Sequence, residues 1–243
     1  MKRRRRFAQS GIPVLALLLS AAPAIPQERG ITLPVRHDHF LGSCAGTLVL
    51  DEHGVRFETN RVNDARTWQY EDLREITVES GRRLKLYTYE DRSYWRLGAD
   101  RVFEFRWSEE SPSPQQIYAW LREHSRSPIG AALIAPEFAP ARFDLPVKHL
   151  GILKGTPGRL QFADLGVVFR AADERSSRSW RYQDIESIAS GGPYDLTLTT
   201  YERQRFHYAS RRDFNFQLRE FLPRDVYDSL WRFVKEQKQR ESR

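Results

Sequence analysis

The sequence predicts a mainly β protein of the α+β class, built as two like domains in tandem, each a run of antiparallel strands followed by one helix. Two observations lead to this prediction. The stretch WQYEDLREI, which begins at Trp68, returns as WRYQDIESI at Trp180, 112 residues later. Around both copies, short segments alternate apolar and polar residues with a period of two, which is typical of half-buried strands. A duplicated domain follows.

The same offset carries most of one half of the chain onto the other. The segment LPVRH at 33–37 returns as LPVKH at 145–149, and the match continues without a gap as far as Glu90. Beyond Glu90 the offset falls by a few residues, and such length changes belong in surface loops. We expect the domains to span 31–125 and 143–238.

The strands of the first domain are predicted from the alternation, in chain order. A hairpin is expected around the turn Asp51–Gly54, because strand-like segments flank it on both sides. Trp68 and Tyr70 are two residues apart, so in a third strand both side chains would lie on the face that packs against a core. The predicted strands cover residues 46–50, 55–59, 68–70, 76–78, 84–87 and 102–107.

One helix is expected to close each domain. In the first, Ser113 is a suitable N-cap, Pro114 the first helical residue and Gln116 the third, which together form a capping box. In the second, the helix is expected to begin at Pro223. Its apolar stripe comprises Val226, Tyr227, Leu230, Phe233 and Val234. The polar residues from Lys235 onward are expected to fray.

An Ala- and Pro-rich segment, 126–142, separates the two domains. Its three prolines are typical of a linker with extended, semi-rigid character. Apolar residues within it, such as Ile129, Leu133 and Phe138, would also let it pack along one domain.

Residues 1–24 have the three parts of an export signal: a basic run at 2–6, an apolar stretch at 12–19 and Ala22-Pro23-Ala24. The apolar stretch is shorter than the roughly 20 residues that span a bilayer. We expect cleavage after Ala24 and a location in the periplasm or outside the cell, with an uncleaved N-terminal anchor as the alternative. Because the twin-arginine pattern at Arg4–Phe7 has poorly matching flanks, the export route stays open.

The net charge of +7 does not predict a nucleic-acid partner. Five of the basic residues lie at positions 2–6, inside the expected signal, and without them the excess is about +2. The remaining Lys and Arg are interleaved with Asp and Glu, whereas a phosphate-binding surface needs clustered, uncompensated basic residues.

Cys44 is the single cysteine, so no internal disulfide can form. It lies in an apolar, strand-like stretch and is expected to be a small buried side chain. Nearby, His37 and His39 share one face of a strand and with Asp38 could hold a metal. The second copy keeps only His149, so histidines used for packing or hydrogen bonding are favoured. No metal site and no cofactor is predicted.

The repeated motif supplies the only other candidates for chemistry. Asp72 and Asp184 could be catalytic acids, but each follows an aromatic strand at a place where a carboxylate caps a short helical turn or braces a bend. The aromatic residues are expected in the core, with a ligand platform as the second interpretation. The motif comprises Trp68, Tyr70, Asp72 and Ile76, and then Trp180, Tyr182, Asp184 and Ile188. We interpret it as structural and predict no catalytic residue.

The order of six or seven strands and a final helix resembles the pleckstrin-homology-like fold, and is most similar to bacterial PH-like and GRAM-like domains. The resemblance rests on a Gly-x-Leu-x-Leu strand, a Gly-Val-x-Phe strand and the Trp-x-x-x-Asp segment. In the first copy it is carried by Gly46, Leu48, Leu50, Gly54, Val55, Phe57, Trp68, Asp72, Leu73 and Ile76, and in the second by Gly158, Leu160, Gly166, Val167, Phe169, Trp180, Asp184, Ile185 and Ile188. It implies a bent sheet sandwich or barrel closed at one corner by the helix.

Phosphoinositide binding is disfavoured, because the first hairpin loop lacks the basic cluster that lipid-binding members of this fold use. That loop reads DEHG at 51–54 and ADLG at 163–166. A fold alone does not fix an activity.

The sequence therefore favours a non-catalytic, exported binding or scaffolding protein that presents its duplicated domains to a protein partner in the cell envelope. The alternative is a binder of a lipid or a small apolar ligand in the cleft between the domains, and an enzyme with an unrecognised site comes third. A partner surface predicts an exposed apolar patch or edge strand. A ligand site predicts an enclosed apolar pocket.

Overall fold

A computed structural model of the chain describes residues 30–39, 42–91, 100–151, 154–203 and 211–241. The expected export signal, 1–24, lies outside the described residues. Within the described ranges, no helix is both long and apolar enough to cross a membrane.

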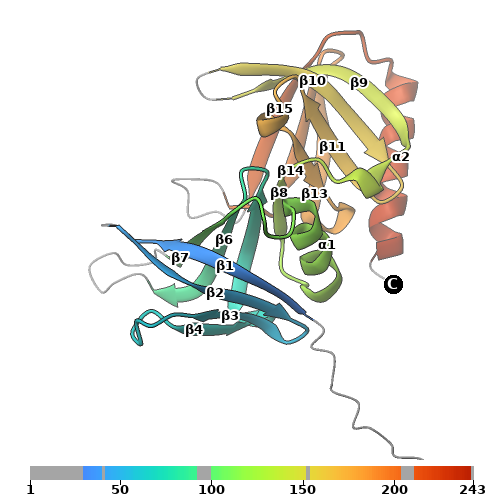
Figure 1. Cartoon of the computed structure of the whole chain (residues 1–243). Helices are drawn as coiled ribbons and strands as arrows, with labels where there is room; N and C mark the ends of the chain where they lie inside the picture. The colour runs from blue at the N-terminus through green and yellow to red at the C-terminus, as the bar shows by residue number, and fades with distance from the viewer. Residues whose placement is uncertain (1–29, 40–41, 92–99, 152–153, 204–210, 242–243) are drawn as a thin grey trace, which may run out of the picture.

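The first half consists of an antiparallel set of strands followed by a helix (Figure 1). Its elements are β1 (Gly30–Asp38), β2 (Ser43–Asp51), β3 (Gly54–Glu58), β4 (Arg66–Gln69), β5 (Leu73–Glu79), β6 (Arg83–Asp91), β7 (Asp100–Trp107) and α1 (Pro114–His124). In space the strands run β5-β6-β7-β1-β2-β3-β4, because β1 pairs with both β2 and β7.

The second half has the same order of elements. They are β9 (Ala141–Leu150), β10 (Gly155–Ala163), β11 (Gly166–Ala171), β12 (Arg178–Trp180), β13 (Ile185–Gly192), β14 (Asp195–Thr200), β15 (Arg212–Leu218) and α2 (Arg224–Glu241). Their order in space, β13-β14-β15-β9-β10-β11-β12, reproduces that of the first half. Even the register agrees: His37 lies opposite Cys44, and His149 lies opposite Thr156. The predicted fold class, mainly β with one closing helix in each half, is confirmed.

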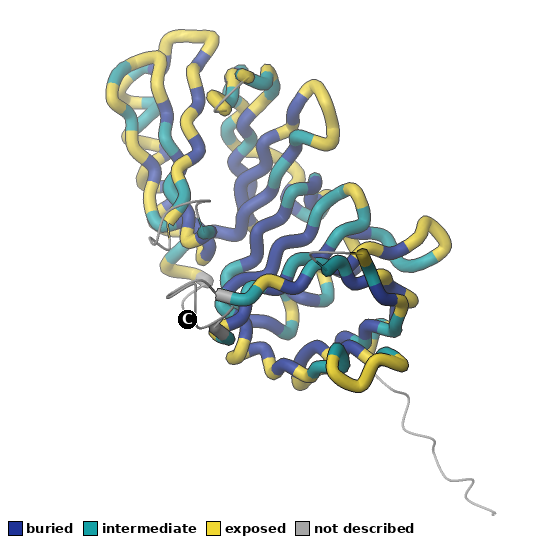
Figure 2. Tube along the Cα trace, turned by 90° about the vertical axis from the view of Figure 1, so that its left-hand side faces the viewer, coloured by how far each residue is buried: buried dark blue, intermediate teal, exposed yellow. Residues whose placement is uncertain are grey.

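Each half has its own apolar core. The ring centroids of Trp68 and Phe103 lie 4.6 Å apart, and those of Trp180 and Phe214 lie 4.8 Å apart in the second half. A buried ring of this size removes roughly 150–250 Å² from water, which stabilises the fold by about 4–6 kcal/mol. Figure 2 shows buried residues along the strands of both halves and where the halves meet.

The segment predicted as a linker contains a strand, β8 (Ile129–Ala132), and a 3-10 turn, η2 (Pro136–Phe138). β8 pairs in parallel with β5 and at one position, Ala131 opposite Ser179, with β12. It thereby joins the two halves into one 15-stranded sheet. Burial of Ile129, Leu133 and Phe138 holds the segment in place. The sequence showed the apolar residues but not their partner strand.

Both helices begin close to their predicted starts. The capping box is confirmed: Gln116 N donates to Ser113 Oγ, and Ser113 N donates to Gln116 Oε1. α2 begins at Arg224 and continues to Glu241. The expectation that the chain frays from Lys235 is therefore wrong for residues up to Glu241, because Lys238 bonds to β13 and Gln237 is buried.

Candidate protein-binding site

The repeated tryptophans are core residues with a shared polar contact. Trp68 Nε1 donates to Glu90 Oε1 at 3.0 Å, and Trp180 Nε1 donates to Glu202 Oε1 at 2.9 Å. Both pairs are separated by 22 residues in the chain. Because both indole rings are buried, neither offers a face to a ligand.

The repeated tyrosines also bond within their own half. Tyr70 OH donates to the carbonyl of Asp51 at 2.9 Å, and Tyr182 OH donates to the carbonyl of Ala163 at 2.6 Å. Each hydroxyl reaches the end of the strand that precedes the first hairpin turn. The third predicted strand stops at Gln69, because Tyr70 already belongs to a 3-10 turn.

The repeated aspartates lie at the ends of equivalent 3-10 turns, η1 (Tyr70–Asp72) and η4 (Tyr182–Asp184). Asp72 is exposed and accepts a hydrogen bond from Gln69 N at 2.9 Å. Asp184 is buried and accepts two hydrogen bonds from the guanidinium of Arg181, at 2.6 and 2.8 Å. Burial raises the pKa of Asp184, although Arg181 acts in the opposite direction. Both carboxylates are thus bonded to groups of their own turns.

The two copies differ most at one sheet edge, β5 in the first half and β13 in the second. The outer edge of β5 is covered by β8: Ile76 N donates to the carbonyl of Pro128 at 3.0 Å, and Ser80 N to that of Ala132 at 2.9 Å. At the 112-residue offset, Ile188 on β13 corresponds to Ile76. Among the described strands, none pairs with the outer edge of β13, which ends the sheet.

Side-chain burial follows this difference. Glu75 and Thr77, on the second face of β5, are buried beneath the junction of the two halves. Ser187 and Ala189, which occupy the same places on β13, are exposed. Within the part of the chain that the structure describes, the second copy therefore leaves open a face and an edge that β8 covers in the first copy.

A groove of about 660 Å³ lies between β13 and α2. Its apolar residues are Ile188 and Val234, and Trp231, which is 44% exposed. Lys235 Nζ lies 5.2 Å from the centre of the Trp231 ring. The complete lining comprises Glu186, Ser187, Ile188, Trp231, Val234, Lys235, Lys238 and Gln239. We call this the β13–α2 groove.

Lys238 fixes one end of the β13–α2 groove. Its Nζ donates to the carbonyls of Ile185 and Glu186, at 2.6 and 2.7 Å. Burial of this ammonium lowers its pKa. The contact joins the last turns of α2 to the start of β13, and none of the described strands pairs with the rest of that edge.

The helices that follow the two equivalent edges differ in length. α1 has 11 residues and α2 has 18. After α1 the chain turns back at once, and Ser127 Oγ bonds to the carbonyls of Tyr70 and Leu73, at 2.9 and 2.7 Å. That turn delivers β8 to the edge of β5. α2 instead continues past β13 as far as Glu241, and within the described ranges no strand pairs with the outer edge of β13.

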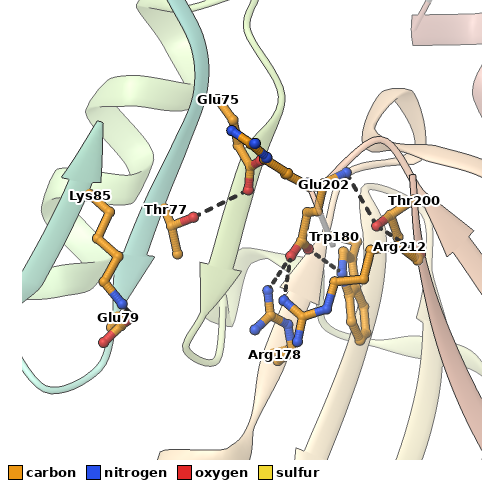
Figure 3. Close-up of polar contacts among 10 residues, drawn as sticks. Glu75, Thr77, Glu79, Lys85, Arg178, Trp180, Thr200, Glu202 and Arg212 are labelled. Carbon is orange, nitrogen blue, oxygen red and sulfur yellow. Dashed lines mark hydrogen bonds and ion pairs between the residues drawn. The ribbon is translucent and has the colours of Figure 1, made fainter. Parts of the chain in front are cut away.

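A buried polar cluster lies where the halves meet (Figure 3). Glu202 accepts from Arg178 at 2.5 Å and from Arg212 at 3.4 Å, in addition to Trp180. Glu75 accepts from Thr77 Oγ1 at 3.3 Å. Burial and then the charge of Glu202 raise the pKa of Glu75 to about 7. A shifted carboxyl of this kind marks active sites in many enzymes, but both side chains are almost completely covered.

The cleft between the halves does not suit an apolar ligand. It measures about 740 Å³, and charged side chains of both signs predominate in its lining. These residues are Glu79, Ser80, Gly81, Arg82, Arg83, Glu109, Ala132, Glu174 and Arg175. Lipid sites are mostly apolar with few polar groups, so this cleft lacks the character that the alternative function requires.

The strand-end histidines pack against aromatic rings in both copies. His37 lies 5.1 Å from Phe105 and His149 lies 5.3 Å from Phe216, measured between ring centroids. Burial lowers the pKa of each imidazole to about 4, so both rings are neutral near pH 7. This packing against a phenylalanine ring explains why a histidine occupies the position in both copies. It gives no reason for the presence of His39.

Comparison with known proteins gives little further information. No family model matches the chain, and no curated protein matches it either. Among solved structures, the chain is similar to that of the Spt16D Pob3N heterodimer at 10% sequence identity, with 71% of this chain and 83% of the other covered and a TM-score of 0.30.

Proposed function

We propose that this chain is a non-catalytic binding protein that accepts an extended, apolar segment of a protein partner as an added strand on β13, within the β13–α2 groove. One observation carries the proposal. In the first copy the same edge, on β5, already holds an extended segment, β8. The chain therefore contains an example of the complex that we propose for its second copy.

The chemistry of β8 describes the expected partner. β8 reads Ile-Gly-Ala-Ala, which is small and uncharged, and its backbone supplies the hydrogen bonds to β5. In strand addition, main-chain bonds give affinity and side-chain pockets give specificity. Ile188, Val234 and Trp231 offer an apolar pocket beside β13. An apolar side chain flanked by small residues fits such a site.

The sequence supports a cellular location and an evolutionary origin for this proposed function. The signal-like segment at 1–24 favours export, and we propose a partner in the cell envelope, met in the periplasm or outside the cell. The 112-residue offset and the equal strand order of the halves support descent of both domains from one PH-like ancestor. After duplication, the edge of β5 would have become paired with β8, and the edge of β13 would have become available to a partner.

A pair of substitutions at Ser190 tests strand addition. Ser190 lies at the 112-residue offset from Val78, between Ile76 and Ser80, whose amides face β8, and it falls where the β13–β14 register shifts between Ala189 and Gly192. Ser190→Pro removes an amide from the edge, and edge strands tolerate proline. Ser190→Ala keeps the amide. Both variants lose the bond from Ser190 Oγ to the carbonyl of Gly192, so this loss is matched, and Ser190→Pro alone removes the amide and fixes φ.

The probe is a displayed library of linear peptides, selected on the wild-type chain. We expect the selected peptides to bind Ser190→Ala and to lose at least tenfold in affinity for Ser190→Pro. Trp231→Ala should also weaken binding, whereas Tyr194→Ala, which removes another exposed aromatic ring, should not. Equal binding to Ser190→Pro and the wild type would contradict the proposal. Co-purification of a lipid, lost on substitution in the cleft between the halves, would favour the alternative.

A further inference from the structure

We propose that His37, His39 and Cys44, with Asp64, form a zinc site beside the turn of the β1–β2 hairpin. Cys44 Sγ lies 3.1 Å from His39 Nε2 and 3.9 Å from His37 Nδ1. The ligand atoms of these three residues all lie within 4.8 Å of one another. Around a tetrahedral zinc ion with Zn–N of about 2.0–2.1 Å and Zn–S of about 2.3 Å, ligand atoms lie roughly 3.3–3.6 Å apart. Small side-chain movements would therefore close the site.

The hairpin brings these side chains together. Cys44 on β2 lies directly opposite His37 on β1, and His39 follows on the same face. Asp38, between the two histidines, points to the other face, where its carboxylate accepts from Arg106 at 2.5 Å. The sequence offered Asp38 as the third ligand, but the fold supplies Cys44 in its place.

Asp64 approaches from the turn before β4. Its Oδ2 lies 3.7 Å from His39 Nε2, the nitrogen that also faces the Cys44 sulfur. In a cysteine nucleophile activated by histidine, the thiol and the orienting carboxylate bond to opposite nitrogens of the ring. Here both approach the same nitrogen, as ligands around a common centre do. The geometry thus favours a metal over a catalytic triad, and Asp64, beside His39, would complete the set of three ligands as a fourth.

The second copy shows that packing alone does not require this set. At the 112-residue offset, His149 replaces His37, but Gly151, Thr156 and Ser176 occupy the places of His39, Cys44 and Asp64. The fold of the second half forms without these three groups. A role particular to the first half explains their presence there.

The ligand types indicate which metal binds. One thiolate, two imidazoles and one carboxylate suit zinc, whereas magnesium and calcium take oxygen ligands. His37 and Cys44 are buried, while the side chains of His39 and Asp64 are 25% and 23% exposed, which gives the ion a path from solvent. Four protein ligands make a closed site, and such sites stabilise folds.

The test uses the full chain, purified without metal and titrated with Co²⁺ and then Zn²⁺. We expect one equivalent of Co²⁺ with tetrahedral d–d bands and a thiolate-to-cobalt charge-transfer band, both lost when Zn²⁺ displaces it. Because Cys44 is the only cysteine, the charge-transfer band reports on Cys44 alone. Cys44→Ser should abolish that band. His39→Ala should weaken Zn²⁺ binding by more than about 100-fold, because even partners of metal ligands contribute 10–100-fold.

His53→Ala is the matched control, since His53 is an exposed histidine of the β2–β3 turn and should leave binding unchanged. His39 is part-exposed, so His39→Ala keeps the proposal testable if Cys44→Ser does not fold. Failure of the folded wild-type chain to take up a stoichiometric ion would overturn the proposal. So would equal Zn²⁺ affinity of His39→Ala and the wild type, or binding of copper without zinc.

Discussion

The carboxylate of Glu75 accepts a hydrogen bond from the backbone amide of Arg203 at 2.8 Å, so that a strand of the first half is fastened to the loop after β14 in the second. Glu75 is 4% exposed, and Glu202, the residue next to that amide, is 1% exposed. Burial leaves the ionised form of Glu75 poorly solvated, and the nearby charge of Glu202 adds repulsion. The pKa of Glu75, raised to about 7, is the consequence.

Replacement of Glu75 by glutamine should stabilise the protein at alkaline pH and have little effect in acid. The folded-state pKa is about 7 and that of an ordinary glutamate 4.5, so the folded state holds the proton more tightly. The resulting stabilisation is complete below about pH 4.5 and is lost as the pH rises through 7. The difference in the free energy of unfolding between Glu75→Gln and the wild type should therefore grow to about 3 kcal/mol near pH 8.

Urea unfolding at a series of pH values measures that gap. Glutamine keeps an acceptor for Arg203 N, and the hydroxyl of Thr77 can accept from its amide. Glu202→Gln is the comparison: it removes a charge that Arg178 and Arg212 both contact, so it should destabilise the fold at neutral pH. A gap that does not vary with pH would show that Glu75 has the same pKa in the folded and unfolded states, and would contradict the raised value.

Asp72 and Asp184 occupy equivalent positions but should respond very differently to replacement by alanine. Asp184→Ala leaves the buried guanidinium of Arg181 without its carboxylate, and we expect a loss of about 3–5 kcal/mol. Asp72→Ala removes one exposed hydrogen bond and should cost about 0.5–1.5 kcal/mol. Denaturant midpoints of the two variants give the comparison. Equal losses would mean that the Arg181–Asp184 pair contributes no more than a turn contact.

Ser179→Ala should loosen the junction between the halves. Ser179 Oγ donates to the carbonyl of Leu133 at 2.8 Å and accepts from Ala135 N at 2.9 Å, all within the core. Without the hydroxyl, two buried backbone groups lose their partner, at a cost of about 2–4 kcal/mol. Ser187→Ala, at an exposed place on β13, should change stability by less than about 0.5 kcal/mol. Calorimetric unfolding distinguishes the two variants, and equal transitions would contradict this role.

Local patterns sufficed to predict the strands that correspond to β2–β7, the aromatic core and the capping box at Ser113, but β1 was not among the predicted strands. They could not show that β8 is a strand. It has only four residues, and it pairs with β5, where Ile76 lies opposite Ile129 although the two are 53 residues apart in the chain. Glu75 and Ser187 occupy equivalent positions, and nothing in the sequence near Glu75 indicates that it is covered. The approach of Cys44 to His37 depends on the register of a hairpin, which residue types alone do not give.

Amide hydrogen exchange should distinguish the two equivalent edges directly. The side chains of Ile76 and Ile188 are both buried, so simple burial predicts similar protection. Ile76 N donates to Pro128 across the β5–β8 pair, whereas the corresponding edge at Ile188 faces the β13–α2 groove. Exchange requires breakage of the hydrogen bond, and unpaired edge amides exchange readily. We expect slow exchange at Ile76, fast exchange at Ile188, and protection of Ile188 when a selected peptide is bound. Slow exchange at Ile188 in the free chain would mean that its amide is already paired, which would leave no edge for a partner strand.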